Sequence, residues 1–360
     1  MATWPIWAVL LAVIGSEPVI TTAAGTGSAG DRGDGGPAIA AQLNQPFDLA
    51  FDRQGNVYMT DTFNHRIRRI DSTTGTIATV AGVGKAGFAG DGGPAVMARV
   101  NEPYGIVVDQ SGNVYFADRL NRRVRRVDGR TGTITTVAGN GTKVFSGDGG
   151  AATEAGLVEP NGVALAHDGQ WLLIADVAGH RIRRVDLASG RIATFAGTGK
   201  GRHDGDGGAA ADASIWGARA VDVGPDGSVY VLEREGNTLR IVSPDNGTIS
   251  TIAGTAAKGY SGDGAPARAA SFNGPKELAV DPTGNIWIVD TENHAIRFID
   301  AASKQIRTVA GTGRSGSDGD GGPATRARLD RPHGVAIGPD GSVWIADTNN
   351  HRIRRVASAR

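Results

Sequence analysis

Residues 347–356 read DTNNHRIRRV and are the last of six related segments in this chain. The earlier copies begin at Asp61, Asp118, Asp176, Glu233 and Asp290, so that successive copies start 57 or 58 residues apart. A spacing this constant indicates an array of one supersecondary unit, and recognising such an array determines the fold class. The rest of the chain is therefore interpreted relative to this repeat.

Each unit contains four short segments that are rich in β-branched and aromatic residues and separated by turn residues, as expected for strands. In the first unit these are Phe47–Asp52 after a proline, Asn56–Thr60, the arginine-rich His65–Ile70, and a segment of the type Ile-x-Thr-Val-Ala-Gly at Ile77–Gly82. Four strands in each of six units predict an all-β fold, a six-bladed β-propeller of four-stranded antiparallel blades.

The first and last segments of the array do not form complete units. Ile20–Gly25 matches the fourth segment of a unit, but the unit that ends at Val356 has no copy of that segment after it. A closed ring resolves both observations, because the N-terminal strand can pair with His351–Val356 and complete the last blade. We therefore predict one propeller domain over residues 20–356.

The repeats resemble NHL repeats, since Asn64-His65-Arg66-Ile67 and Asn350-His351-Arg352-Ile353 match the motif that names that family. The Gly-Asp-Gly-Gly-Pro-Ala loops at Gly33–Ala38 and Gly90–Ala95 are similar to those of bacterial NHL proteins and of the teneurin propeller. The resemblance covers about residues 20–356 and implies a six-bladed propeller closed by a terminal strand. Unit four departs most, because Glu233–Thr238 lacks the histidine and the second arginine.

Residues 1–15 are apolar almost throughout, and no charged residue precedes Glu17. The run is short for a transmembrane helix and resembles the apolar core of a secretory signal, although no Lys or Arg precedes it. We expect residues 1–16 to be a signal peptide, the mature chain to be extracytoplasmic, either periplasmic or secreted, and no part of it to be inserted in a membrane.

The composition restricts the classes of partner and chemistry. Lys plus Arg and Asp plus Glu both number 37, and this balance argues against nucleic-acid binding, which needs a concentrated basic field. The absence of cysteine excludes disulfides and Cys-ligated zinc. No nucleophile elbow or P-loop occurs, so we predict no catalytic residue, no cofactor and a monomer.

Several recurring residues are interpreted as structural. The acid that opens each motif precedes an arginine by seven residues, as in Asp61 and Arg68, and we expect this pair to connect strands. His65, His180, His294 and His351 lie too far from the axis to share a metal ion and are expected to cap a turn. Three Gly-x-Gly-x-x-Gly matches, which begin at Gly25, Gly82 and Gly311, lack the strand and helix of a dinucleotide site.

One acidic residue also recurs in each long loop, and two roles are compatible with it. Asp204-Gly205-Asp206 and Asp318-Gly319-Asp320 have the alternating oxygens that calcium could use. Neither run is followed by the bidentate Glu of an EF-hand, so Asx-turns that order the loop are the preferred interpretation.

One ring of residues varies between units and is the candidate ligand-binding site. The residue at the entry to each innermost strand is, in order, Phe47, Tyr104, Asn161, Arg219, Lys276 and His333. Its successors include Asp48 and Glu277, while the other units have Gly or Ala there. We expect these side chains to converge on one mouth of the channel, with aromatic rings opposite Arg219 and Lys276. The alternative is that residues at the mouth are simply unconstrained by packing.

Two classes of function are compatible with this ring. The first is an exported scaffold that binds a protein, peptide or glycan ligand on the loop face around the central channel, as for most NHL domains. The second is a metal-dependent enzyme at the channel mouth, similar to propeller lactonases and amidating lyases, for which Asp48, Glu277, Asn161 and His333 offer ligands of the right type. The absence of a catalytic motif favours the binding scaffold.

Overall fold

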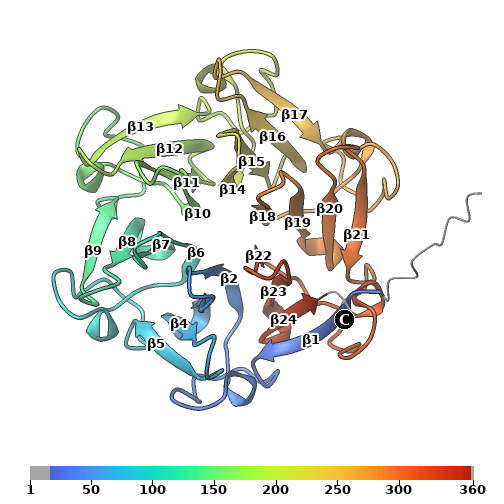
Figure 1. The fold of residues 1–360 in the computed structure, drawn as a ribbon. Helices are drawn as coiled ribbons and strands as arrows, with labels where there is room; N and C mark the ends of the chain where they lie inside the picture. The colour runs from blue at the N-terminus through green and yellow to red at the C-terminus, as the bar shows by residue number, and fades with distance from the viewer. Residues whose placement is uncertain (1–16, 358–360) are drawn as a thin grey trace, which may run out of the picture.

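A computed structural model describes residues 17–357, and these residues form a ring of six four-stranded antiparallel sheets around a central axis (Figure 1). The fold predicted from the repeat is therefore confirmed. The predicted signal peptide lies outside the described residues. Residues 17–357 contain no α-helix, and no helix among them has the length and hydropathy needed to cross a lipid bilayer.

The first three blades follow one another along the chain. Blade 1 comprises β2 (Pro46–Phe51), β3 (Val57–Asp61), β4 (Arg66–Ile70) and β5 (Ile77–Ala81). Blade 2 comprises β6 (Pro103–Val108), β7 (Val114–Asp118), β8 (Arg123–Val127) and β9 (Ile134–Ala138). Blade 3 comprises β10 (Pro160–Leu165), β11 (Trp171–Asp176), β12 (Arg181–Asp186) and β13 (Arg191–Ala196). The first strand of each blade is the innermost.

The other three blades continue the ring and close it. Blade 4 comprises β14 (Ala218–Val223), β15 (Val229–Glu233), β16 (Thr238–Val242) and β17 (Ile249–Ala253). Blade 5 comprises β18 (Glu277–Val280), β19 (Ile286–Asp290), β20 (Ala295–Ile299) and β21 (Ile306–Ala310). Blade 6 comprises β22 (Gly334–Ile337), β23 (Val343–Asp347), β24 (Arg352–Ala357) and the N-terminal strand β1 (Val19–Ala24).

Short 3₁₀ turns connect these strands. Four lie between the second and third strands of a blade, namely η2 (Thr62–Asn64), η4 (Arg119–Asn121), η8 (Thr291–Asn293) and η10 (Thr348–Asn350). Six lie in the long connections, namely η1 (Ala38–Ala40), η3 (Ala95–Met97), η5 (Ala152–Glu154), η6 (Ala210–Asp212), η7 (Ala267–Ala269) and η9 (Ala324–Arg326).

Ring closure occurs where the sequence predicted it. β1 pairs antiparallel with β24, so that Ile20 lies opposite Val356 and Thr22 opposite Arg354. The other edge of β1 is also occupied, because the Ile20 amide donates to the Gly322 carbonyl at 3.1 Å and the Gly321 amide donates to the Ile20 carbonyl at 2.8 Å. The N-terminal strand therefore completes blade 6 and carries no free edge.

The core consists of six apolar layers, each between two consecutive blades. Between blades 1 and 2, for example, Tyr58 and Ile67 pack with Val114, Phe116 and Ile134. Burial of these side chains is the main favourable contribution to folding. The long connections extend along the outer side of the following blade, where the Gly35 amide donates to the Ile77 carbonyl at 2.8 Å.

A buried arginine lies at the centre of the third strand of every blade. Arg125 is fully buried, and its guanidinium contacts Asp118 at 3.1 Å, as predicted, and also the loop residue Asp91 at 2.6 Å. Both acids lie within 4 Å of the arginine in every blade except blade 3, where Arg183 contacts only Asp148 in this way. The recurring loop acids thus pair with arginine, which the Asx-turn interpretation did not anticipate.

The four recurring histidines cap turns, as predicted, and also connect blades. His65 has a left-handed backbone conformation (φ 51°), and its Nδ1 accepts a hydrogen bond from the Glu102 amide of blade 2 at 3.2 Å. His180, His294 and His351 accept in the same way from the following blade. In blade 4 the residue is Asn237, whose Oδ1 accepts from the Gly274 amide at 2.9 Å.

His65 and His351 make their blade junctions sensitive to acid. Burial lowers the pKa of His65, although the charge of Glu102 opposes this, and burial also lowers the pKa of His351. An imidazole with a lowered pKa favours the fold when neutral, so its contribution is complete above its unfolded pKa of about 6.5 and is lost as the pH falls below that value. Protonation converts Nδ1 into a donor that faces another donor. We expect a loss of about 0.5–1 kcal/mol per hydrogen bond in the free energy of unfolding.

The matched variant is the double substitution His65→Asn and His351→Asn, which introduces the residue that blade 4 already uses. Buried carboxylates titrate in the opposite sense, so the informative quantity is the parent-minus-variant difference in the free energy of unfolding between pH 7.5 and pH 5. The parent should lose more stability than the variant as the pH falls. Equal losses would show that these histidines are not the sensitive groups.

Candidate functional site

The six variable residues lie at or next to the start of the innermost strands and meet at the axis. Phe47, Asn161, Arg219, Lys276 and His333 are buried, and Tyr104 is half-buried. The antiparallel blades place the turns η2 and η4 on this same face, because the Phe63 amide donates to Asn44 and the Leu120 amide to Asn101. We call this end of the channel, with its six variable residues, the plugged mouth.

The aromatic members of the ring stack on one another. The ring centroids of Phe47 and Tyr104 are 4.3 Å apart with an interplanar angle of 27°, and those of Phe47 and His333 are 4.2 Å apart. The Arg219 guanidinium lies over the Tyr104 ring, 5.2 Å from its centroid, which is a cation–π geometry. The aromatic and cationic side chains therefore touch, rather than facing each other across an open mouth as blade order suggested. Large side chains converging from six strands fill the axis.

A polar cluster closes the other half of the ring. His333 Nδ1 lies 2.8 Å from the Arg331 carbonyl, which can only accept, so Nδ1 carries the proton and Nε2 accepts from Lys276 Nζ at 3.0 Å. Lys276 also contacts Glu292 at 3.2 Å, and Arg331 contacts Glu292 at 2.6 Å. Burial lowers the pKa of Lys276 to about 8, and burial together with the Lys276 charge lowers the pKa of His333 well below its usual value. At neutral pH the cluster has a neutral histidine.

The residue that follows each member of the variable ring is small in most blades because the strands converge. A Cβ atom on Gly105 would lie 2.5 Å from the carbonyl oxygen of Asn161, and one on Gly334 would lie 2.5 Å from that of Phe47. Asp48 and Glu277 are the two exceptions with long side chains. Both line a cavity of about 610 Å³ on the channel side of the plugged mouth.

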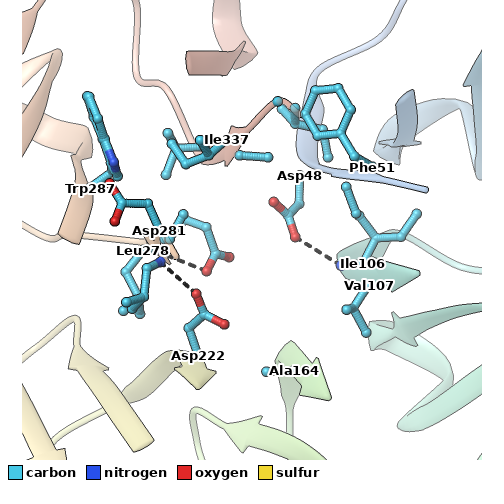
Figure 2. Close-up of a pocket in the computed structure, with 18 of the residues that line it drawn as sticks. Asp48, Phe51, Ile106, Val107, Ala164, Asp222, Leu278, Asp281, Trp287 and Ile337 are labelled. Atoms are coloured by element: carbon cyan, nitrogen blue, oxygen red, sulfur yellow. Dashed lines mark hydrogen bonds between the residues drawn. The ribbon is translucent and has the colours of Figure 1, made fainter. Parts of the chain in front are cut away.

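The lining of this channel cavity includes acidic side chains and no Lys, Arg or His. Figure 2 shows Asp48 and Asp222 pointing into the same space, and Glu277 also lines it. Asp48 accepts from the Ile106 amide at 2.9 Å, and Asp222 accepts from the Val280 amide at 2.8 Å. Burial raises the pKa of Asp48 to about 7, that of Asp222 to about 6 and that of Glu277 well above its usual value. The charge of Arg219 opposes this effect at Asp48 and Glu277.

Asp222 was not among the residues proposed from sequence. It lies two positions beyond Ala220 on β14, so it points to the same side of the strand, and an aspartate on such a strand is a signal that alternation could have identified. Within residues 17–357, no three His, Cys, Asp or Glu side chains are grouped as they would be around a metal ion. The carboxylates are instead held by backbone amides.

Comparisons with known proteins agree with the fold and the repeat family. The family model described as NHL repeat matches residues 272–297 and 329–356, and the model described as teneurin NHL domain matches residues 83–146. Protein SUPPRESSOR OF QUENCHING 1, chloroplastic, of Arabidopsis thaliana is 29% identical over 269 residues, covering 72% of this chain and 25% of that protein.

NHL repeat-containing protein 2 of Bos taurus is 27% identical over 289 residues, covering 71% of this chain and 38% of that protein. The chain thus spans well under half the length of these two relatives. Among solved structures, an auxiliary nutrient binding protein from Bacteroides thetaiotaomicron superposes with a TM-score of 0.69 at 18% identity. The match covers 95% of this chain and 76% of the compared chain. At this identity the similarity concerns the fold.

Proposed function

Because the chain is an NHL-repeat six-bladed β-propeller, we propose that it is a binding scaffold whose ligand, a protein, peptide or glycan, lies across the plugged mouth. The proposal includes an extracytoplasmic location and a ligand site formed by the six residues of the plugged mouth. Asp48 and Glu277, the other two residues proposed from sequence, line the channel cavity behind this mouth. One structural neighbour is an auxiliary nutrient binding protein, which supports the class of function.

The observation that carries this proposal is apolar surface around the plugged mouth. Phe63 is 38% exposed, Leu120 39% and Trp216 45%, and all three lie on the face where the innermost strands begin. Phe63 also packs edge-on against Phe47 of the ring, with centroids 6.1 Å apart. Exposed aromatic side chains on a rigid floor are typical anchors for sugar rings and peptide side chains.

Charged pairs surround this surface and would supply directional contacts. Arg119 lies over the Tyr104 ring and bonds Glu102 at 2.5 Å and Glu159 at 3.1 Å. Across the mouth, Glu292 holds both Lys276 and Arg331. Since the axis is filled, a ligand meets a floor rather than a deep catalytic cavity, and recognition rather than turnover is the chemistry that this face supports.

The test compares exposed residues on this face with exposed residues elsewhere. Parent protein is first screened against a glycan array and a random peptide library, and the best binder is then titrated against Phe63→Ala and Trp216→Ala. Each substitution is expected to weaken binding by about 2 kcal/mol, roughly thirtyfold, because it removes an anchor from the contact. All variants should unfold at the same temperature as the parent.

Met97→Ala and Ile39→Ala are the matched controls, because these side chains are 70% and 51% exposed and lie in η3 and η1 of the long connections. They should bind like the parent. A binder whose affinity is unchanged by Phe63→Ala and Trp216→Ala would place the site away from the plugged mouth, and an absence of any glycan or peptide binder would contradict the proposal itself.

A further inference from the structure

Blade 3 differs from the other blades at one buried position of the second strand. The other five blades have an aromatic residue there, which points toward the following blade, namely Tyr58, Tyr115, Tyr230, Trp287 and Trp344. The corresponding residue of blade 3 is Leu173, which packs with Val229 and Val231 of blade 4. The ring that fills this volume between other blades is therefore missing between blades 3 and 4.

A pocket of about 560 Å³ lies in this place. Besides Leu173, its walls include Trp171, Phe195, Val223, Pro225 and Pro244, and it opens at the end of the propeller opposite the plugged mouth, beside the turn that joins β10 to β11. The pocket is thus separate from the proposed ligand face. Trp171, Phe195 and the two prolines supply flat apolar walls, which suit a flat ring, and the lining also includes polar side chains, among them Asp168 and Asp226.

One cation in the pocket lacks the partners that its counterparts have. Arg69, Arg126 and Arg355 lie opposite Tyr58, Tyr115 and Trp344 across the strand pair, and each bonds an aspartate at 2.5–3.1 Å. Arg184 lies opposite Leu173, and among residues 17–357 it makes no salt bridge. Its guanidinium lies 4.2 Å from the Trp171 ring centroid and 5.7 Å from that of Phe195.

Blade 1 shows which groups surround the corresponding arginine. Tyr58 lies opposite Arg69, and the charges of Arg69 and Asp52 both act on the pKa of its phenol. In blade 3 the residue at the position of Asp52 is Ala166, so the phenol and that carboxylate are absent, while Asp186, at the position of Asp71, remains. The remaining combination is an apolar slot for a ring with an arginine donor beside it.

We propose that the pocket between blades 3 and 4 binds a small molecule with an aromatic ring and an oxygen acceptor, with phenols as the simplest class. The ring occupies the volume that tyrosine fills in blades 1 and 2, between Trp171, Phe195 and Leu173. The Arg184 guanidinium donates to the phenol oxygen. This site requires neither the plugged mouth nor its ligand, so it can be tested independently of the proposed function.

The probe is 4-fluorophenol, whose ¹⁹F signal is followed by NMR as purified full-length protein is added. We expect saturable broadening and a shift with the parent, and binding at least tenfold weaker to fluorobenzene, which has no hydroxyl. Leu173→Tyr supplies from within the chain the side chain that blades 1 and 2 already accommodate. It should weaken 4-fluorophenol binding at least tenfold while the protein stays folded.

Two further variants keep the test decisive. Val144→Tyr introduces the same side chain at a position that is 63% exposed and remote from the pocket, and it should bind like the parent. Arg184→Gln changes a partly exposed residue and should reduce the preference for 4-fluorophenol over fluorobenzene. The proposal is overturned if the parent shows no saturable binding, or if a folded Leu173→Tyr variant or the Arg184→Gln variant binds 4-fluorophenol as the parent does.

Discussion

Deleting residues 1–26 is expected to lower the midpoint of thermal unfolding by more than about 10 °C, because the deletion removes β1 from blade 6. The loss exposes the backbone edge of β24 and leaves the carbonyl of Gly322 and the amide of Gly321 without their partner, Ile20. It also opens the ring, because each of the other five blades is built from four consecutive strands and only blade 6 joins strands from both ends of the propeller. Circular dichroism or calorimetry of parent and truncated protein measures the effect.

A pair of point substitutions separates the packing of β1 from other effects of the deletion. Ile20 is fully buried between blades 5 and 6, whereas the neighbouring Thr21 is exposed. Ile20→Ala should cost about 2–5 kcal/mol in the free energy of unfolding, and Thr21→Ala should cost close to nothing. A truncated protein as stable as the parent would show that β1 does not hold the ring closed.

Asp118→Ala is expected to destabilise the fold by about 3–5 kcal/mol, because it removes a buried anion from a fully buried arginine. Asp118 accepts from the Asn101 amide at 2.7 Å, from Asn121 at 2.8 Å and from Arg125 at 3.1 Å. The substitution removes the acceptor of the Asn101 amide and of Arg125 Nη1, and leaves Asp91 as the one acid bound to the arginine. Urea denaturation at pH 7 measures the difference in the free energy of unfolding.

Asp212→Ala is the control for loss of a negative charge, because Asp212 is exposed and makes no salt bridge with the residues that the structure describes. It should change the free energy of unfolding by less than about 0.5 kcal/mol. If Asp118→Ala were equally mild, the recurring acid would not be the structural partner of the arginine.

The ring and its closure could be predicted because both are repetitive. One motif with one spacing gives the number of blades, and the unmatched segments at Ile20 and Val356 give the pairing of β1 with β24. The acid partners were harder to identify. Asp91 lies 34 residues before Arg125, and in sequence it is one of many recurring residues in a glycine-rich loop. Only the path of that loop along the outer side of the next blade brings the two together.

The residues of the candidate site could be predicted from sequence, but their packing could not. Variation between repeats identified Phe47, Tyr104 and the other ring residues, and strand order predicted that they would meet. Whether six such side chains leave a hole or fill it depends on the diameter of the channel, which the spacing of repeats does not reveal. The pocket beside Leu173 is a related case. Alignment of the units shows that blade 3 lacks the aromatic residue, but only the packing of blades 3 and 4 shows that a pocket results.

The position of the closing strand bears on how such a chain can evolve. Among residues 17–357 the first strand is the fourth of blade 6 and the last strand is the third of the same blade, so the ring is closed inside a blade rather than between two blades. Duplication or loss of one whole repeat would leave the same two strands to pair, whatever the number of units. The side chains at the plugged mouth would respond differently, since a set that fills the axis of six blades would leave a gap in seven and clash in five. Closure therefore tolerates a change in repeat number, while the axial ring selects for six.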